Sequence, residues 1–92
     1  MSVAPLQLSI SPNPAATQTT IHFSLDGNES VSIQIMDMMG RTMHNVVNGE
    51  LMQAGAHSIP ITLPEEWATG IYFIHVGTAT GVGNTIRLVK TY

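Results

Sequence analysis

The sequence predicts an all-β domain built as an antiparallel sandwich of seven to eight strands. Three observations lead to this prediction. Apolar and polar residues alternate with the period of two that is typical of half-buried strands. Turn signals separate these runs at short and regular spacing. No segment keeps the periodicity of an amphipathic helix, so the turns have to join strands to strands.

Length and composition narrow the class of protein. The 92 residues fit one domain, which we expect to span residues 6–92. The absence of cysteine excludes disulfides and thiolate metal sites. Charged residues make up 10% of the chain, and the basic ones are too few for a nucleic-acid groove. No apolar run is long enough for a membrane-spanning helix. Neutral polar residues in place of charges are typical of extracellular β domains.

The first three predicted strands each have one apolar face. These faces consist of Leu6, Leu8 and Ile10, then Ile21, Phe23 and Leu25, and then Val31, Ile33 and Ile35. Between the first two lies Pro12-Asn13-Pro14, where the prolines lack an amide hydrogen and force their predecessors towards extended conformations. We expect this turn to direct the first strand away from its sequence neighbour.

The middle of the chain contains three further turn signals. Asp37 and Gly40 suit the first and last positions of a β-turn. A strand over residues 41–47 follows, and Asn48-Gly49 then predicts a tight hairpin turn. A short strand or bulge over residues 51–53 ends at Gly55. The next strand, over residues 57–63, carries Pro60, which favours a sheet edge.

The C-terminal third predicts a crossing loop followed by a hairpin. Its strands are "IYFIHV" and "TIRLVK", joined by the loop "GTATGVG". Trp67, Gly70 and Tyr72 have the spacing of a tyrosine corner, which pins a connection between two sheets and favours an immunoglobulin-like sandwich with Greek-key connections. The strand that begins with Ile71 is apolar on both faces, which indicates a central position.

The sequence offers little that supports catalysis. The four histidines fall in four different predicted strands, without the clustered carboxylates of a metal site. Glu65 and Glu66 are adjacent, so on an extended chain they point apart. No serine lies in a nucleophile elbow, and the glycine-rich loop precedes no helix that could cradle phosphate. We therefore expect a protein that is not an enzyme, with no cofactor, no metal and no nucleophile–base pair.

Two features admit a binding interpretation. Four methionines surround the Asp37–Gly40 turn, namely Met36, Met38, Met39 and Met43. Methionine clusters form adaptable binding surfaces, although they fill gaps in cores more often, and core filling is the favoured interpretation here. Trp67 could stack on a sugar, but the tyrosine-corner spacing explains it as a core residue.

The ordered set of motifs resembles a known family. "SPNPA", "IMDMMGR", "LMQAGAHSIPI", "WATGIYFIHV" and "TIRLVKTY" follow one another at spacings similar to those of the type A C-terminal sorting domain of the type IX secretion system of Bacteroidetes. The resemblance covers residues 6–90. Two positions depart from the family pattern: Ser11 stands where an aromatic residue is frequent, and Trp67 stands where leucine is more frequent.

The resemblance implies a transport signal. Family members follow an N-terminal cargo that has entered the periplasm by a conventional signal peptide. The type IX machinery moves the cargo through an outer-membrane translocon, and a sortase-like protease usually removes the domain and attaches the cargo to the cell surface. Residues 1–5 would then be a linker remnant or an added start. The implied location is the periplasm in transit, then the cell surface or the extracellular space.

The resemblance also implies candidate signal residues in the last two strands. These are Gly70, Ile71, Tyr72, Arg87, Leu88, Val89 and Lys90. A terminal strand at a sheet edge offers unpaired backbone groups for strand addition, and Arg87 with Lys90 makes the C-terminal end locally positive. The candidate structural turns are Pro12, Asn13, Pro14, Asp37, Gly40 and Gly55. The alternative is an immunoglobulin-like accessory, spacer or carbohydrate-binding module of a secreted hydrolase.

Overall fold

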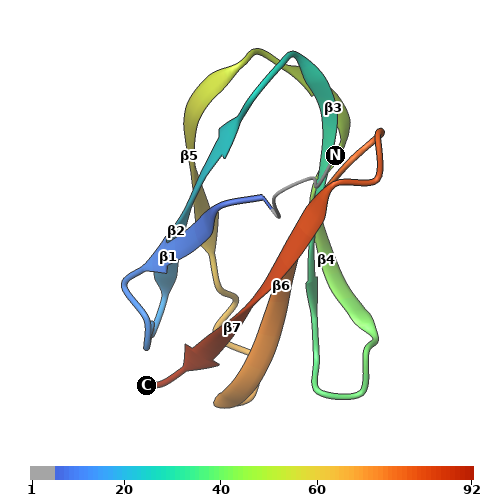
Figure 1. The fold of residues 1–92 in the computed structure, drawn as a ribbon. Coiled ribbons are helices and arrows are strands. Elements are labelled where there is room, and N and C mark those ends of the chain that lie inside the picture. Colours follow the sequence, from blue (N-terminus) through green and yellow to red (C-terminus); the bar gives the residue numbers. More distant parts are fainter. Residues whose placement is uncertain (1–5) are drawn as a thin grey trace.

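A computed structural model describes residues 6–92 of the chain, so the expected linker remnant at residues 1–5 lies outside the described residues. The described part is all-β (Figure 1). Its strands are β1 (Leu8–Ser11), β2 (Gln18–Leu25), β3 (Glu29–Met36), β4 (Thr42–Met52), β5 (Gly55–Thr62), β6 (Gly70–Thr78) and β7 (Gly83–Lys90). No helix of residues 6–92 could cross a membrane.

The strands form two antiparallel sheets that face each other. One sheet has the order β1-β2-β5 and the other the order β4-β3-β6-β7. The chain crosses between the sheets after β2, β4 and β5, while β1 lies beside β7 across the sandwich (Figure 1). The prediction of an immunoglobulin-like sandwich is confirmed, as is the central position of β6 between β3 and β7.

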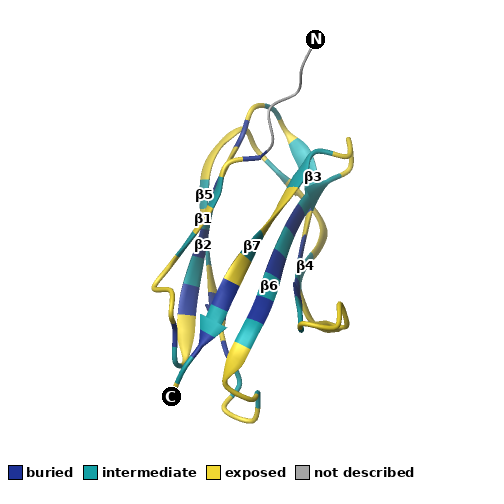
Figure 2. Cartoon of the chain, turned by 60° about the horizontal axis from the view of Figure 1, so that its bottom comes forward, coloured by how far each residue is buried: buried dark blue, intermediate teal, exposed yellow. Residues whose placement is uncertain are grey.

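The core lies between the two sheets and follows the alternation of the sequence. In Figure 2, buried bands recur along β6 and β7 with less buried bands between them. The predicted apolar faces of β2 and β3 are buried, and Leu6 joins them. The largest fully buried apolar side chains are Ile21, Ile33, Ile35, Leu63, Ile74, Leu88, Val31 and Val76. Hydrophobic burial is therefore the main stabilising term.

The tyrosine corner is confirmed at the crossing from β5 to β6. The Tyr72 hydroxyl donates a hydrogen bond of 2.7 Å to the carbonyl oxygen of Ala68, and the side chain is 6% exposed. The Trp67 ring stacks on the Tyr72 ring with centroids 5.3 Å apart. Trp67 is only partly buried, so it packs against the core and covers the corner but is not one of the fully buried core residues. These contacts hold the first residues of β6 against the β5–β6 loop.

The prediction of a hairpin turn at Asn48-Gly49 is wrong. β4 continues through this dipeptide as one strand from Thr42 to Met52. Gly49 has a φ of 66°, but it uses this conformation in a bulge, where the β3–β4 register shifts between Val31 and Ile33. The Gly49 N–H donates to Ser32 Oγ and the Gly49 carbonyl accepts from Ser30 Oγ, both at 3.0 Å. These serines on β3 bind the bulge.

The expected role of Pro12-Asn13-Pro14 is also wrong. β1 pairs antiparallel with β2, its sequence neighbour, in a register from Leu8 with Phe23 to Ser11 with Thr20. The turn therefore closes a β1–β2 connection, in which Thr19 Oγ1 donates to the carbonyl oxygen of Pro12 at 2.8 Å. The two proline peptide bonds are cis.

The methionines follow the prediction of core filling only in part. Met38 and Met39 are 69% and 82% exposed at the tip of the β3–β4 turn. Met43 is exposed as well, while Met36 is half-buried. The reason is positional, because the middle residues of a β-turn point away from both strands. Core filling is therefore wrong for Met38 and Met39, and also for the exposed Met43.

Candidate functional site

The candidate signal residues lie on the β6–β7 hairpin, where the pairing alternately places them inside and outside the sandwich. Tyr72 pairs with Leu88, and Gly70 pairs with Lys90 at the end of the sheet. Tyr72, Leu88 and Lys90 are 6%, 0% and 6% exposed. A partner that docks on the folded domain cannot reach these three side chains, so their first role is in packing.

The outer face of the hairpin presents the remaining candidates. Ile71 pairs with Val89, and Phe73 pairs with Arg87 in the next row. Ile71, Phe73 and Val89 are half-buried, and Arg87 is exposed. Met36 on β3 extends the second row beside Phe73. The result is an apolar strip with one guanidinium at its β7 border.

The expectation that β7 offers free backbone groups is wrong at its C-terminal end. Residues 13–15, here called the strap, lie along the outer edge of β7. Asn13 Nδ2 donates to the carbonyl of Arg87, and the Val89 N–H donates to Asn13 Oδ1, both at 3.0 Å. The Ala15 N–H donates to the Val89 carbonyl and the Thr91 N–H donates to the Ala15 carbonyl, both at 2.9 Å. The sequence could not indicate this, because Asn13 and Arg87 are far apart in the chain.

The other end of the same edge is fastened by a side chain of β7. Asn84 Nδ2 donates to the carbonyl of Leu6 at 3.0 Å, just before β1 begins. The Thr85 N–H donates to Asn84 Oδ1 at 2.8 Å. Sequence analysis did not single out Asn84. Two asparagines, Asn13 and Asn84, thus join the N-terminal segment to the last strand.

The predicted turn at Asp37–Gly40 is confirmed. The Gly40 N–H donates to the Asp37 carbonyl at 3.0 Å, and Gly40 has a φ of 82°. Burial acts to raise the pKa of the Asp37 carboxyl, but the N–H groups of Arg41 and Met39 and the Arg41 guanidinium outweigh it, so the pKa lies below its ordinary value. Arg41 Nε and Asp37 Oδ2 are 2.8 Å apart. Gly55, with a φ of 116°, begins β5.

A second surface lies at the end of the sandwich where this turn meets the β5–β6 loop. The groove there is lined by side chains that include Met38, Met39, Met43, Trp67 and Ile71. It adjoins the apolar strip of the hairpin through Ile71. This end therefore combines the exposed methionines with two of the motifs that sequence analysis singled out.

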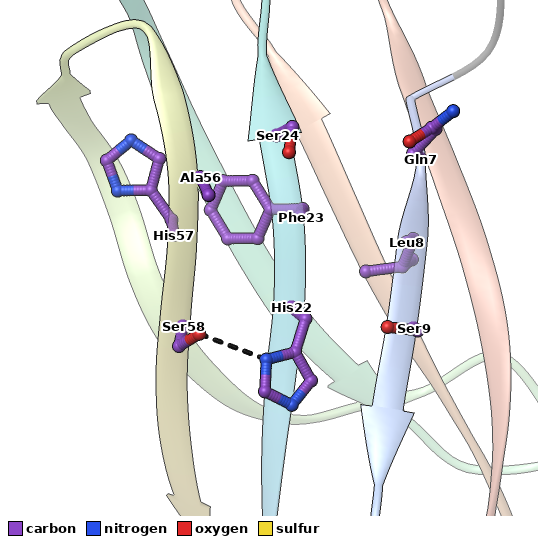
Figure 3. A pocket seen from close by; sticks show the side chains of 9 residues that line it. All are labelled: Gln7, Leu8, Ser9, His22, Phe23, Ser24, Ala56, His57 and Ser58. Carbon is purple, nitrogen blue, oxygen red and sulfur yellow. Dashed lines mark hydrogen bonds between the residues drawn. The ribbon is translucent and has the colours of Figure 1, made fainter.

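The outer face of the three-stranded sheet brings together a histidine and two serines. His22 Nδ1 lies 3.0 Å from Ser58 Oγ, and His22 Nε2 lies 3.2 Å from Ser11 Oγ (Figure 3 shows the Ser58 contact). The expectation of no nucleophile–base pair is thus wrong as far as contacts go, because His22 lies within hydrogen-bonding distance of two serine hydroxyls. Catalytic serine–histidine pairs have the base oriented by a third group, usually a carboxylate. No carboxylate is among the nine residues that line this depression.

Two other histidines, His57 and His75, bond to uncharged groups, and His57 lines the same depression as His22. The His57 ring stacks on Phe23 with centroids 5.4 Å apart, and its Nε2 lies 2.6 Å from the carbonyl oxygen of Gln53. His75 Nδ1 lies 2.8 Å from Thr85 Oγ1. Within residues 6–92, no group of three or more histidine, aspartate or glutamate side chains is placed to hold a metal ion.

These features define a class of protein: an immunoglobulin-like sandwich whose last hairpin presents an apolar outer strip and whose last strand is tied to the N-terminal segment. The family model described as the secretion system C-terminal sorting domain matches residues 9–90, which is nearly the whole chain. The chain belongs to this family. It is thus a sorting signal of the type IX secretion system. The domain interacts with that machinery for export towards the cell surface. No curated protein matches the chain.

Proposed function

We propose that this domain carries an N-terminally linked cargo from the periplasm through the outer-membrane translocon of the type IX system. A sortase-like protease then cuts upstream of β1 and attaches the cargo to the cell surface. The observation that carries this proposal is the family match over residues 9–90. We further propose that the domain is not an enzyme.

Within this function, the outer strip of the β6–β7 hairpin is the surface that the machinery contacts. Ile71 and Val89 are half-buried and Arg87 is exposed, so a folded domain presents them directly. A half-buried apolar strip beside a cation suits a protein partner that combines aliphatic contacts with an acidic group. Tyr72, Leu88 and Lys90 support the strip from inside the sandwich.

The transport function is tested with a reporter fused to residues 1–92 behind a periplasmic signal peptide. In a bacterium with a working type IX system, we expect the reporter at the cell surface. The same reporter without the domain, and the fusion in a strain without the translocon, should both remain in the periplasm. Periplasmic retention of the intact fusion in the competent strain would contradict the proposal. Surface display without the translocon would favour a module with another role.

The contact surface is tested by two single variants, in each of which one arginine is replaced by glutamine. Arg87→Gln removes the guanidinium of the strip, and Arg41→Gln removes the other exposed arginine, which bonds to Asp37 at the β3–β4 turn. Neither change touches the core, so both variants should fold. We expect export to fall several-fold for Arg87→Gln alone. Equal export of the two variants would remove Arg87 from the recognised surface.

A further inference from the structure

The strap (residues 13–15) makes the contacts that a neighbouring strand would make. The Asn13 carboxamide accepts from the Val89 N–H and donates to the Arg87 carbonyl, as one peptide group of an added strand does. Ala15 then bonds with both its N–H and its carbonyl, and its bridge to Lys90 is parallel. The edge of β7 therefore already binds an extended peptide that runs parallel to it.

The strap protects the edge of β7 by a different means from those that protect the other three edge strands. β5 carries Pro60 within its span, β1 is only four residues long, and the β3–β4 register shifts at three places along β4. Each of these features blunts an edge permanently, because it belongs to the strand itself. The strap belongs to a connection. It can leave while β7 keeps its eight paired positions with β6.

The strap also has defined attachment points and a small anchor. The Thr19 hydroxyl binds the Pro12 carbonyl before it, and the Leu63 N–H binds the Thr17 carbonyl after it, both at 2.8 Å. Between these points only Ala15 is buried, at 2% exposure. Withdrawal of the strap would remove one methyl group from the core and free four hydrogen-bonding groups, three on β7 and the N–H of Thr91 just after it.

We propose that an extended strand of the type IX machinery displaces the strap and pairs in parallel with the edge of β7. The incoming strand carries a small residue opposite Lys90, because Ala15 fills that buried position. The proposal rests on the transport function proposed above and names the contact by which the machinery holds the domain. Strand addition at an exposed sheet edge is an established mode of peptide recognition.

The test locks the strap with a disulfide. Ala15 and Lys90 are bridge partners, whose spacing suits a disulfide, and the natural chain has no cysteine to interfere. A reporter fused to the Ala15→Cys/Lys90→Cys variant should be retained when the bond forms in the oxidising periplasm. A reductant should then restore export by roughly tenfold, which corresponds to about 1.4 kcal/mol.

A second staple serves as the matched control. Ser9→Cys/His22→Cys links β1 to β2 at a cross-strand pair outside the core and leaves the strap free. We expect this variant to be exported in both redox states. Export of the oxidised strap staple at the level of its reduced form would overturn the proposal. Equal retention of both staples would also overturn it, because export would then require the whole sandwich to open. Retention of the unmodified fusion would instead contradict the transport function itself.

Hydrogen exchange on the isolated chain provides an independent measurement. The Val89 and Thr91 amides face the strap, whereas the Leu88 amide faces β6 by the alternation of the strand. In the Asn13→Ala variant, we expect exchange at Val89 and Thr91 to accelerate at least tenfold more than exchange at Leu88, whose rate changes only with the global stability. If all three amides accelerate together, the strap does not open as a separate unit and the proposal fails.

Discussion

The two lateral sides of the sandwich are closed in different ways. On the β1–β7 side, the strap and Asn84 join the N-terminal segment to the last strand by backbone and amide hydrogen bonds. On the β4–β5 side, the sheets end at a groove lined by residues that include Val47, Leu51, Met52, His57 and Ile59. There the edges are protected by Pro60 and by the bulged course of β4.

This difference shows that edge protection and side-to-side closure are separate problems. Proline and bulges prevent strands from adding to an edge, but they do not join the two sheets. On the β7 side, the hydrogen bonds of the strap both cover the strand edge and join the two sheets. A core residue on β7 should therefore matter far more than an exposed apolar residue on β4, and four pairs of substitutions test the comparison of the two sides.

The largest expected effect comes from one truncation on each side. Leu88 on β7 is 0% exposed and Leu51 on β4 is 75% exposed. We expect Leu88→Ala to lower the free energy of unfolding by about 3 kcal/mol, from lost burial and the cavity that remains. Leu51→Ala should change it by no more than about 0.5 kcal/mol. Urea denaturation measures both, and equal losses would show that β4 is more deeply packed than described.

The second effect compares two asparagines. Asn13 bonds twice to the backbone of β7, whereas Asn28 accepts one bond of 2.9 Å from the Ala54 N–H at the β4–β5 turn. At roughly 1 kcal/mol for each net hydrogen bond, Asn13→Ala should cost about 2 kcal/mol and Asn28→Ala about 1 kcal/mol. Thermal unfolding midpoints provide the comparison. A larger loss for Asn28 would show that the open side, and not the strap, limits stability.

The sequence predicted what depends on local alternation. The buried faces of β2, β3 and β6, the edge position of β5 and the tyrosine corner all follow from periodicity, a proline and one spacing. Each of these signals is contained within a few residues. The candidate signal positions also resolved into reachable and unreachable ones only because pairing sets the direction of each side chain.

Prediction from the sequence failed where a residue suits two local structures and a contact with a distant residue determines which one forms. Asn48-Gly49 suits a positive φ in a hairpin turn and equally in a bulge, and the serines of β3 decide for the bulge. The side chain of Asn13 could have bonded to its own turn, but it bonds to β7. Such choices depend on tertiary pairing, so local patterns do not contain them.

A smaller effect is expected from the bulge on the open side. Gly49 has a φ of 66°, and a methyl group added to it would meet only the Ser30 hydroxyl oxygen, 4.0 Å away. Gly27 has no positive φ, and the space beside it is open. Gly49→Ala should therefore cost about 1 kcal/mol from backbone strain alone. Gly27→Ala should leave stability unchanged within about 0.5 kcal/mol. Chemical denaturation of the pair decides, and a neutral Gly49→Ala would show that the bulge relaxes freely.

The smallest expected effect is the pH dependence of the β3–β4 turn, which borders the open side. The pKa of Asp37 is lowered in the folded chain, because the Arg41 and Met39 N–H groups and the Arg41 guanidinium outweigh the opposing effect of burial. A carboxyl with a lowered folded pKa stabilises the fold above its unfolded pKa of about 3.9, and this contribution is lost as the pH falls through the folded pKa.

In the Asp37→Asn variant this stabilising contribution is absent at every pH. The difference in unfolding midpoint between wild type and Asp37→Asn should thus shrink as the pH is lowered from neutrality to below 4. Because the Arg41 side chain is largely exposed, solvent screens its attraction for Asp37, and we expect a small difference that added salt reduces further. The Asp26→Asn variant, which alters a carboxylate of the β2–β3 turn, serves as the control. A difference for Asp37→Asn that grows as the pH falls would contradict the assigned direction of the pKa shift.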